Sequence, residues 1–382
     1  MLNRSKALLL VVVTVLMLVP ALAGHAVVVA AAGGVQNPAD GVVVATQLLN
    51  PRGLTIAPNG TLYIAEAGSG GPEPIVDPDF GLSTRGFTGR VTAIARDGTR
   101  TVIADDLPST ALGGFEPLGP AGVTLARGRL YLAVGLTNAG YAPRSGDASV
   151  YGINPHNGKR SILTYLGGYE FAQNPDGFGL ESNPYGIAYS GGSLYVADAG
   201  GNSLYRIDPR TGQFTLVTVF EGLPLPFPFE NGGRGGANEE DPVPTGLAGA
   251  RDGVYVTLLG GFPFAPGLSK AVHVAADGAV TDVALGLTLP VAAAVGPDGA
   301  LFITEFAQGL DVNTFSYYPN SGRVLRVLPD GTTDVVIDGL NLPNGLAFDK
   351  RGNLYVTVNS NNPPSAGAQG AVLRFENVAG HR

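Results

Sequence analysis

Two stretches of this sequence, close to its two ends, share one pattern. The stretch NPRGLTIAPNGTLYIAEAGS covers residues 50–69, and LPNGLAFDKRGNLYVTVNS covers residues 342–360. Each has a proline, one further residue and a glycine, followed by an apolar run and a short turn that ends in glycine. A second apolar run containing Leu-Tyr comes next. Two short apolar runs joined by a glycine turn are typical of a β-hairpin.

The pattern recurs along the chain, so internal repetition decides the fold. Six copies begin at Pro51, Pro120, Pro184, Pro244, Pro290 and Pro343. Each copy continues through a loop into a third apolar strand, such as GRVLRVL at residues 322–328. In the first five copies a tight turn and a fourth strand follow. Four antiparallel strands repeated about a ring predict an all-β fold, a six-bladed β-propeller with four antiparallel strands per blade.

The sixth copy ends without a fourth strand, whereas the chain carries an unassigned strand before the first copy. This strand is VVVATQL at residues 42–48, directly ahead of Pro51. An open ring would leave unpaired strand edges. The sequence therefore predicts that the N-terminal strand closes the last blade. One propeller is expected over residues 42–377, followed by a C-terminal tail at 378–382.

The N-terminus has the pattern of an export signal. Arg4 and Lys6 precede an apolar run at residues 7–19, and small residues follow at 21–24. This pattern predicts a signal peptide over residues 1–26, cleaved near Ala23 or Ala26, and a short flexible segment over 27–41. The protein is then secreted or periplasmic and has no membrane span. The alternative is an uncleaved membrane anchor, because the apolar character continues beyond the cleavage points.

The composition argues against several classes of function. Charged residues make up 14% of the chain and the net charge is −8, with no basic stripe, so we expect no nucleic-acid partner. The chain has no Cys, which excludes thiol catalysis and iron–sulfur clusters. Only four His are present, and none is expected at the channel mouth. A Ser-His-Asp triad and a His-based zinc site are therefore disfavoured.

The long insertions all belong to the connections that open on one face of a propeller, whereas the turns of the other face are short. Function concentrates on elaborated loops held by a rigid scaffold, so this long-loop face is the expected working face. The alternative is sequence drift without function. The candidate ligand-binding residues on these loops are aromatic: Tyr141, Phe178, Phe227, Phe229, Phe262, Phe264 and Tyr317. They predict a partner that is a small molecule, a glycan or a protein. Alternatively, the loops simply pack on one another.

Carboxylates end three of the six second strands. Glu66, Asp198 and Glu305 hold these places in the first, third and fifth copies, and Asn344 and Asn359 belong to the sixth. Oxygen ligands that converge at a channel mouth could hold Ca²⁺. The alternative is structural, because Asp and Asn side chains often bond to nearby backbone.

The repeated P-x-G-L-x-x-x-x-x-G-x-L-Y-V-x-D pattern resembles the NHL and gluconolactonase-like six-bladed propellers. Over residues 42–377 it resembles the ScyD/ScyE family more closely. The gluconolactonase-like relatives hold a metal with Glu, Asn and Asp at the channel mouth, and Glu66, Asn344 and Asp198 match these types. The ScyD/ScyE family itself offers no agreed catalytic residues to carry over.

Two functions remain open. The first is an exported propeller that binds a ligand on its long-loop face. The second is a metal-dependent, Ca²⁺-type hydrolase of the lactonase kind that uses the carboxylates. Scarce His and the absence of a nucleophile motif favour a binding protein over an enzyme. No cofactor is required by the motifs, and Ca²⁺ is the one candidate. Fold alone does not decide, because propellers support both kinds of function.

Overall fold

The computed structural model describes residues 35–78, 80–113, 116–229, 238–367 and 369–380. The predicted signal peptide lies outside them. The all-β prediction is confirmed: strands dominate, and within the described residues the helical elements are α1 (Gly167–Gln173) and the short 3₁₀ turns η2 (Pro38–Asp40) and η4 (Pro364–Ala366). None of the helices in these residues is long and apolar enough to cross a membrane.

The strands form one principal sheet for each copy of the repeat. In the first sheet the order is β2 (Pro51–Ile56), β3 (Leu62–Glu66), β5 (Gly81–Ile94), β6 (Arg100–Leu112) and β7 (Glu116–Leu118), with β4 (Glu73–Asp77) paired to β5. The second contains β8 (Pro120–Ala126), β9 (Arg129–Val134), β11 (Ser149–Ile153) and β12 (Arg160–Tyr165). The third contains β14 (Pro184–Ser190), β15 (Ser193–Asp198), β16 (Ser203–Ile207) and β17 (Phe214–Val219).

The second half of the chain repeats this order. The fourth sheet contains β20 (Pro244–Gly249), β21 (Gly253–Leu258), β22 (Ser269–Ala275) and β23 (Val280–Leu287). The fifth contains β24 (Pro290–Val295), β25 (Leu301–Glu305), β28 (Gly322–Val327) and β29 (Thr333–Leu340). The sixth contains β30 (Leu346–Phe348), β31 (Leu354–Val358), β32 (Gly370–Phe375) and β1 (Val42–Leu48).

The N-terminal strand β1 completes the sixth sheet, as the missing fourth strand predicts. It pairs antiparallel with β32, with Val42 opposite Arg374 and Leu48 opposite Gly370. The residues that precede it are also anchored, because Gln36 bridges to Ile337 on β29. The described end of the predicted flexible segment is therefore bound to the fifth sheet. At the other end of the chain, the N–H of Ala379 donates to the carbonyl of Gly352.

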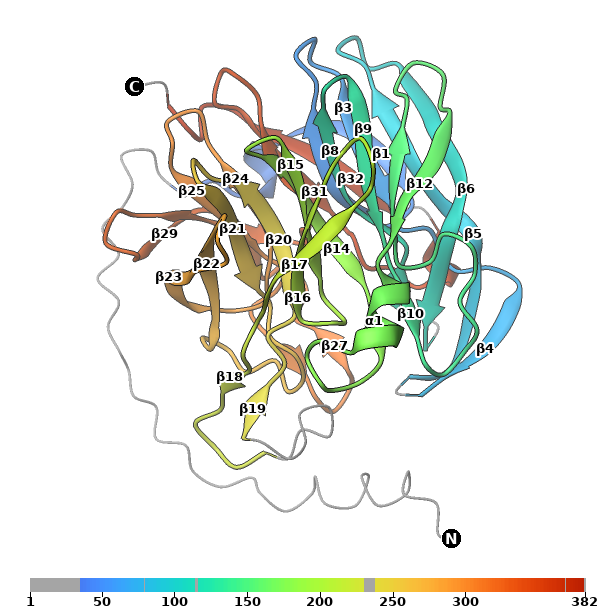
Figure 1. Cartoon of the computed structure of the whole chain (residues 1–382). Coiled ribbons are helices and arrows are strands. Elements are labelled where there is room, and N and C mark those ends of the chain that lie inside the picture. The colour runs from blue at the N-terminus through green and yellow to red at the C-terminus, as the bar shows by residue number, and fades with distance from the viewer. Residues whose placement is uncertain (1–34, 79, 114–115, 230–237, 368, 381–382) are drawn as a thin grey trace, which may run out of the picture.

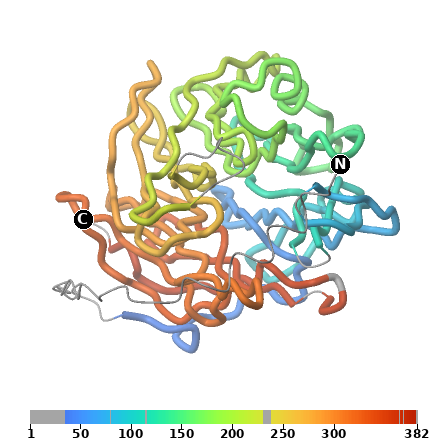
Figure 2. The backbone as a smooth tube through the Cα atoms, turned by 90° about the horizontal axis from the view of Figure 1, so that it is seen from below, coloured from blue at the N-terminus to red at the C-terminus, as the bar shows by residue number. Residues whose placement is uncertain are grey.

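The first strands contact one another in sequence. The contacts run from β2 to β8, β14, β20, β24 and β30, and β30 contacts β2 in turn. Figure 2 shows the sheets following one another in chain order around a common centre. Apolar clusters fill the spaces between neighbouring sheets. One of these clusters joins Leu48 and Val372 of the sixth sheet to Ile64 of the first.

The repeated glycine has a packing reason at this centre. A Cβ on Gly186 would overlap the carbonyl oxygen of Thr245 on the next first strand, and one on Gly345 would lie 2.5 Å from the carbonyl oxygen of Arg52. Real Cβ atoms do not approach other atoms so closely, so the close approach of neighbouring first strands requires glycine at these positions.

The long insertions lie together at one end of the sheets (Figure 1). Here α1 and small two-stranded sheets replace what the sequence predicts as plain loops. The pairs are β10 (Thr137–Asn138) with β13 (Glu181–Ser182), β18 (Leu223–Pro224) with β19 (Glu239–Glu240), and β26 (Leu310–Asp311) with β27 (Ser316–Tyr317). The insertion after β3 forms β4 and the first half of β5. These two segments pair antiparallel with each other, with Glu73 opposite Arg85.

Candidate functional site

The carboxylate of Glu66 is bonded within its own surroundings. Its side chain is fully buried, and Oε2 accepts hydrogen bonds from the N–H of Leu49 at 2.5 Å and from Nη2 of Arg90 at 2.7 Å. The hydroxyl of Thr92 donates to Oε1. These contacts join β3 to β5 and to the end of β1, so Glu66 stabilises the junction of the first and last sheets.

Asp198 and Glu305 have similar surroundings in the third and fifth sheets. Burial raises the pKa of Asp198, against hydrogen bonds from Ser182 and backbone N–H groups that lower it. Two of these donors, the hydroxyl of Ser182 and the N–H of Asn183, lie at 2.6 Å. Glu305 accepts from Nε of Arg323 at 2.5 Å and from the N–H of Thr288 at 2.7 Å.

The structure does not bring these three carboxylates together in one group. Over the described residues, no three side chains of His, Cys, Asp or Glu are grouped so that they could hold a metal. Each carboxylate is bonded to donors of its own sheet and the segment leading into it, which leaves it in the wall of the ring. Asn359 also stays local, because its Oδ1 accepts from Asn341 and its Nδ2 donates to the carbonyl of Gln369.

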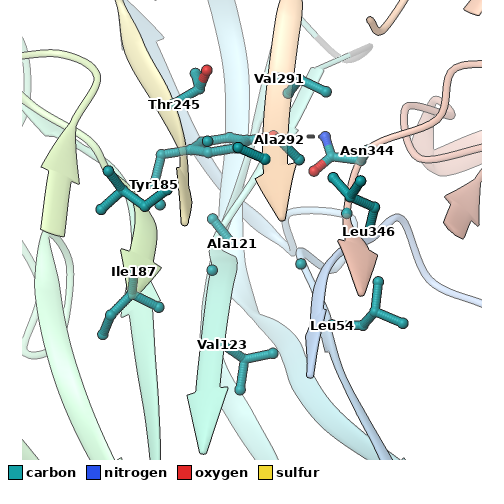
Figure 3. Close-up of a pocket in the computed structure, with 17 residues that line it drawn as sticks. Leu54, Ala121, Val123, Tyr185, Ile187, Thr245, Val291, Ala292, Asn344 and Leu346 are labelled. Carbon is teal, nitrogen blue, oxygen red and sulfur yellow. Dashed lines mark hydrogen bonds between the residues drawn. The ribbon is translucent and has the colours of Figure 1, made fainter. Parts of the chain in front are cut away.

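Asn344 is the one proposed metal ligand that reaches the central channel. It holds the middle position of the Pro-x-Gly motif, and its Nδ2 donates to the hydroxyl of Tyr185 at 2.6 Å. Tyr185 holds the same position in the third sheet, whereas Asn344 belongs to the sixth. The Tyr185 ring thus lies across the channel (Figure 3). The cavity lined by these residues measures about 70 Å³, which has room for only a few water molecules.

The middle positions of the six motifs are equivalent, and all of them except Arg52 line this cavity. They are Arg52, Ala121, Tyr185, Thr245, Val291 and Asn344. This set contains no carboxylate, and its one charged member is a cation. It is a poor match for a hard divalent cation, which prefers several oxygen ligands that include carboxylates. Sequence reasoning missed this set, although a signal was present: the residue after the motif proline differs in every copy, whereas the next residue is Gly in five of the six.

Three further groups lie near Arg52 on the long-loop side. Burial raises the pKa of Glu116, and the Arg52 guanidinium partly offsets this effect. Burial also raises the pKa of Tyr317, helped by Glu116 and opposed by Arg52. Tyr185 adds a smaller increase to the Tyr317 pKa. Tyr317 and Tyr185 pack against one apolar cluster that contains Val291, and the charges of Arg52 and Glu116 act on the Tyr317 phenol.

A row of aromatic rings leads from this mouth to the surface. The rings of Tyr317 and Phe264 lie 6.2 Å apart, and those of Phe264 and Phe262 lie 6.1 Å apart. Phe262 is 5.8 Å from both Phe229 and Phe315 and stacks on the latter. We call Phe229, Phe262, Phe264, Phe315 and Tyr317 the aromatic row. Its inner members, Phe264 and Tyr317, are partly buried, whereas Phe262 is 41% and Phe315 56% exposed.

The structure thus brings together four of the seven predicted ligand-binding aromatics, from three different insertions. The other three lie outside the row. Tyr141 packs beneath the guanidinium of Arg85 at 5.5 Å, and burial raises the pKa of Tyr141. Phe178 follows α1, where its N–H donates to Asp176. Phe227 is 42% exposed on the segment that leads to Phe229.

Two more buried carboxyl groups come from the insertions. Glu170 on α1 is fully buried, and neither of its oxygens has a hydrogen-bond partner in the described part of the chain. Burial raises its pKa to about 8, with Asp198 as the next cause. Glu240 on β19 accepts one bond from the N–H of Ala265, and burial raises its pKa to about 7.

Comparison with known proteins places the chain among propeller-type proteins. Residues 184–363 match the model of the SMP-30/Gluconolactonase/LRE-like region. This match covers the third sheet to β31 of the sixth. No curated protein matches the chain significantly.

Two solved structures resemble the whole fold. A gluconolactonase from Xanthomonas campestris superposes with a TM-score of 0.51 at 15% identity, covering 87% of each chain. A protein of unknown function from Bacteroides thetaiotaomicron gives 0.52 at 14% identity, covering 90% of this chain and 74% of that one. The protein is therefore an all-β, propeller-type chain, and residues 184–363 are similar to the SMP-30/Gluconolactonase/LRE-like region. The closer ScyD/ScyE assignment stays a prediction.

Proposed function

We propose that the protein is a six-bladed propeller that binds a small, largely apolar molecule with aromatic character on its long-loop face. The observation that carries this proposal is the aromatic row. It runs without interruption from exposed Phe262 and Phe315 to Tyr317 at the channel mouth. Rings that are partly exposed and partly held by one another offer a flat apolar surface, which suits stacking by another ring.

The ligand in this proposal lies over the channel rather than inside it. The hydrogen bond between Tyr185 and Asn344 spans the axis, and the cavity around it is about 70 Å³. Pockets for small organic ligands are several times larger, roughly 300 Å³ or more. The channel mouth therefore supplies a polar floor, and the aromatic row supplies the wall of the site.

The metal-dependent lactonase is the alternative that the family likeness suggests. Its metal would need oxygen ligands at the axis, but Glu66, Asp198 and Glu305 are bonded inside their own sheets. The middle positions of the motif contribute the guanidinium of Arg52 instead of a carboxylate. These residues do not fit a hard cation, so we derive no step through one.

Export belongs to the same proposal. Its support is the charged, apolar and small-residue pattern at residues 1–26, which precedes the described part of the chain. A secreted or periplasmic location would bring the long-loop face into contact with molecules outside the cytoplasm. A glycan would need the same face, and its binding is an outcome of the experiment below.

The experiment uses N-phenyl-1-naphthylamine, an uncharged aromatic probe whose fluorescence rises on binding. We expect saturable binding, which Phe264→Ala and Phe262→Ala weaken about tenfold each, since a lost ring contact of about 1.4 kcal/mol changes affinity by that factor. Phe87→Ala is the matched control, because Phe87 is 51% exposed and stacks with Arg144 instead of the row. Absent probe binding, or binding only of neutral oligosaccharides, would refute the proposal.

A further inference from the structure

Arg52 is a buried cation without a carboxylate partner. Its side chain is 5% exposed, and Nη2 donates to the carbonyl of Pro117 at 2.7 Å. No ion pair within the described residues includes it. Arg85 shows the usual arrangement: it is 8% exposed and pairs with Glu73 at 2.6 Å. A buried charge without a partner is costly, so the environment of Arg52 suits an additional anion.

The groups nearest to Arg52 leave its charge uncompensated. Glu116 lies on β7, next to the carbonyl that Arg52 binds, yet it makes no ion pair with Arg52 within 4.0 Å. Burial raises the Glu116 pKa, which favours its neutral form. Burial raises the pKa of Tyr317, which keeps its phenol neutral. Arg52 thus has no carboxylate within ion-pair distance among the described residues.

Resting on the proposed function, we infer that Arg52 binds an anionic group of the ligand. The ligand is then an aromatic carboxylic acid, with its ring on the aromatic row and its carboxylate at the guanidinium. Arginine presents two parallel N–H donors that match the two oxygens of a carboxylate. Nη2 gives one of its two N–H groups to Pro117, so its other N–H, together with that of Nε or Nη1, remains for the ligand.

Tyr185 and Asn344 offer a hydrogen-bond donor to a ligand group that carries acceptor oxygens. The hydroxyl of Tyr185 accepts from Asn344, which leaves its own proton free to donate to a ligand oxygen. Asn344 and Tyr185 come from opposite sides of the ring and hold each other in place. A carboxylate above them would meet Arg52 on one side and this hydroxyl below.

A second reading assigns Glu116 as the counter-ion of Arg52, with no role for a ligand. The two readings differ in what happens when Glu116 becomes Gln. If Glu116 neutralises Arg52, the variant loses stability and gains nothing in binding. If Arg52 binds the carboxylate of a ligand, Glu116→Gln removes the repulsion between the Glu116 carboxylate and that ligand and strengthens carboxylate binding.

The experiment compares naphthalene-2-carboxylate with naphthalene-2-carboxamide, which share a ring system but differ in charge. Direct calorimetric titration at pH 7 is expected to show at least tenfold tighter binding of the carboxylate. Arg52→Met should reduce this ratio to about one, and Arg52→Lys should leave an intermediate ratio because the charge stays but the planar fork is lost. Arg127→Met is the control, since Arg127 is exposed and bonds to Tyr189.

The outcomes separate the two proposals. Equal binding of both naphthalene compounds by the unaltered protein overturns the anion site. The aromatic binding site is tested separately, by the binding of N-phenyl-1-naphthylamine. A ratio that Arg52→Lys and Arg52→Met leave unchanged also overturns it. If Arg52→Met does not fold, as judged by circular dichroism, the ratio in the unaltered protein and in Arg52→Lys still decides.

Discussion

Two sets of buried or partly buried carboxyl groups differ in the hydrogen bonds that they accept. The wall carboxylates, Glu66, Asp198 and Glu305, end second strands and belong to the repeat. Each accepts hydrogen bonds from two or more donors. The loop carboxylates, Glu116, Glu170 and Glu240, come from the segments that lead from one sheet to the next. Burial raises the pKa of each of them.

The difference follows from where the two sets come from in the sequence. A residue at a fixed place of a repeat meets a similar course of the backbone in each sheet. The N–H groups of Leu49, Asn183 and Thr288, which bind the three carboxylates, all lie one or two residues before a first strand. An insertion has no such fixed neighbours. Among the described residues, both oxygens of Glu170 and Oε1 of Glu240 accept no hydrogen bond. Perturbed pKa values of this kind cluster at functional sites, and here they lie on the long-loop face.

The largest expected effect comes from removing β1 together with a donor to Glu66. A chain that begins at Asn50 loses Leu48, which is fully buried, and the N–H of Leu49 that bonds Glu66. The edge of β32 is then unpaired. We expect this chain to unfold at a much lower temperature, or to fail to fold, as followed by circular dichroism. Removing residues 380–382 is the control, and equal melting of the two chains would contradict the role of β1.

A smaller loss is expected from a single wall carboxylate. Glu66→Ala leaves Arg90, the hydroxyl of Thr92 and the N–H of Leu49 without their acceptor. Removing one member of a buried pair costs about 3 to 5 kcal/mol. Urea unfolding should measure this loss. Glu376→Ala, at an exposed pair with Arg374, should leave the midpoint unchanged.

If Glu66→Ala unfolds at the same urea concentration as the unaltered protein, the contrast between the two sets of carboxylates fails. A result in which Glu116→Gln costs as much as Glu66→Ala would have the same meaning.

The smallest effect is expected from a loop carboxylate, and it depends on pH. The pKa of Glu170 is about 8 in the folded protein, against 4.5 for the free group. Between these values the folded state keeps a proton that the unfolded state has released. The free energy of unfolding therefore falls as pH rises from about 4.5 to about 8. Asp198, Asp176 and Glu181 contribute to this shift and face the same group.

Glu170→Gln removes this ionisable group, so the variant lacks its contribution to the pH dependence of the free energy of unfolding. Relative to the unaltered protein, we expect the variant to gain about 2 kcal/mol on going from pH 5 to pH 7, since each pH unit inside this window contributes up to about 1.4 kcal/mol. Urea unfolding at both pH values measures the change. Glu221→Gln, on an exposed residue, is the control. A gain that does not depend on pH would show that Glu170 is already ionised at pH 5.

Part of this architecture could be predicted from residues alone. The glycine turns and the alternating apolar runs gave the strands, because side-chain alternation and turn chemistry are local properties. The missing fourth strand of the sixth copy predicted the pairing of β1 with β32. The helix α1 and the small sheets of the insertions were not predicted, since their short segments carry no strong period.

The candidate site was predicted only in part, and the reason is geometric. The sequence by itself determined the repeat, the sheets and the aromatic character of the insertions. It also determined that the middle residue of each motif would vary. Only the tertiary structure decided that Tyr185 reaches across the axis to Asn344, 159 residues further along the chain. It likewise decided that the wall carboxylates bond inside their sheets and that the charge of Arg52 acts on Glu116 and Tyr317. Such meetings depend on how the sheets are arranged about their centre, and no local pattern encodes that arrangement.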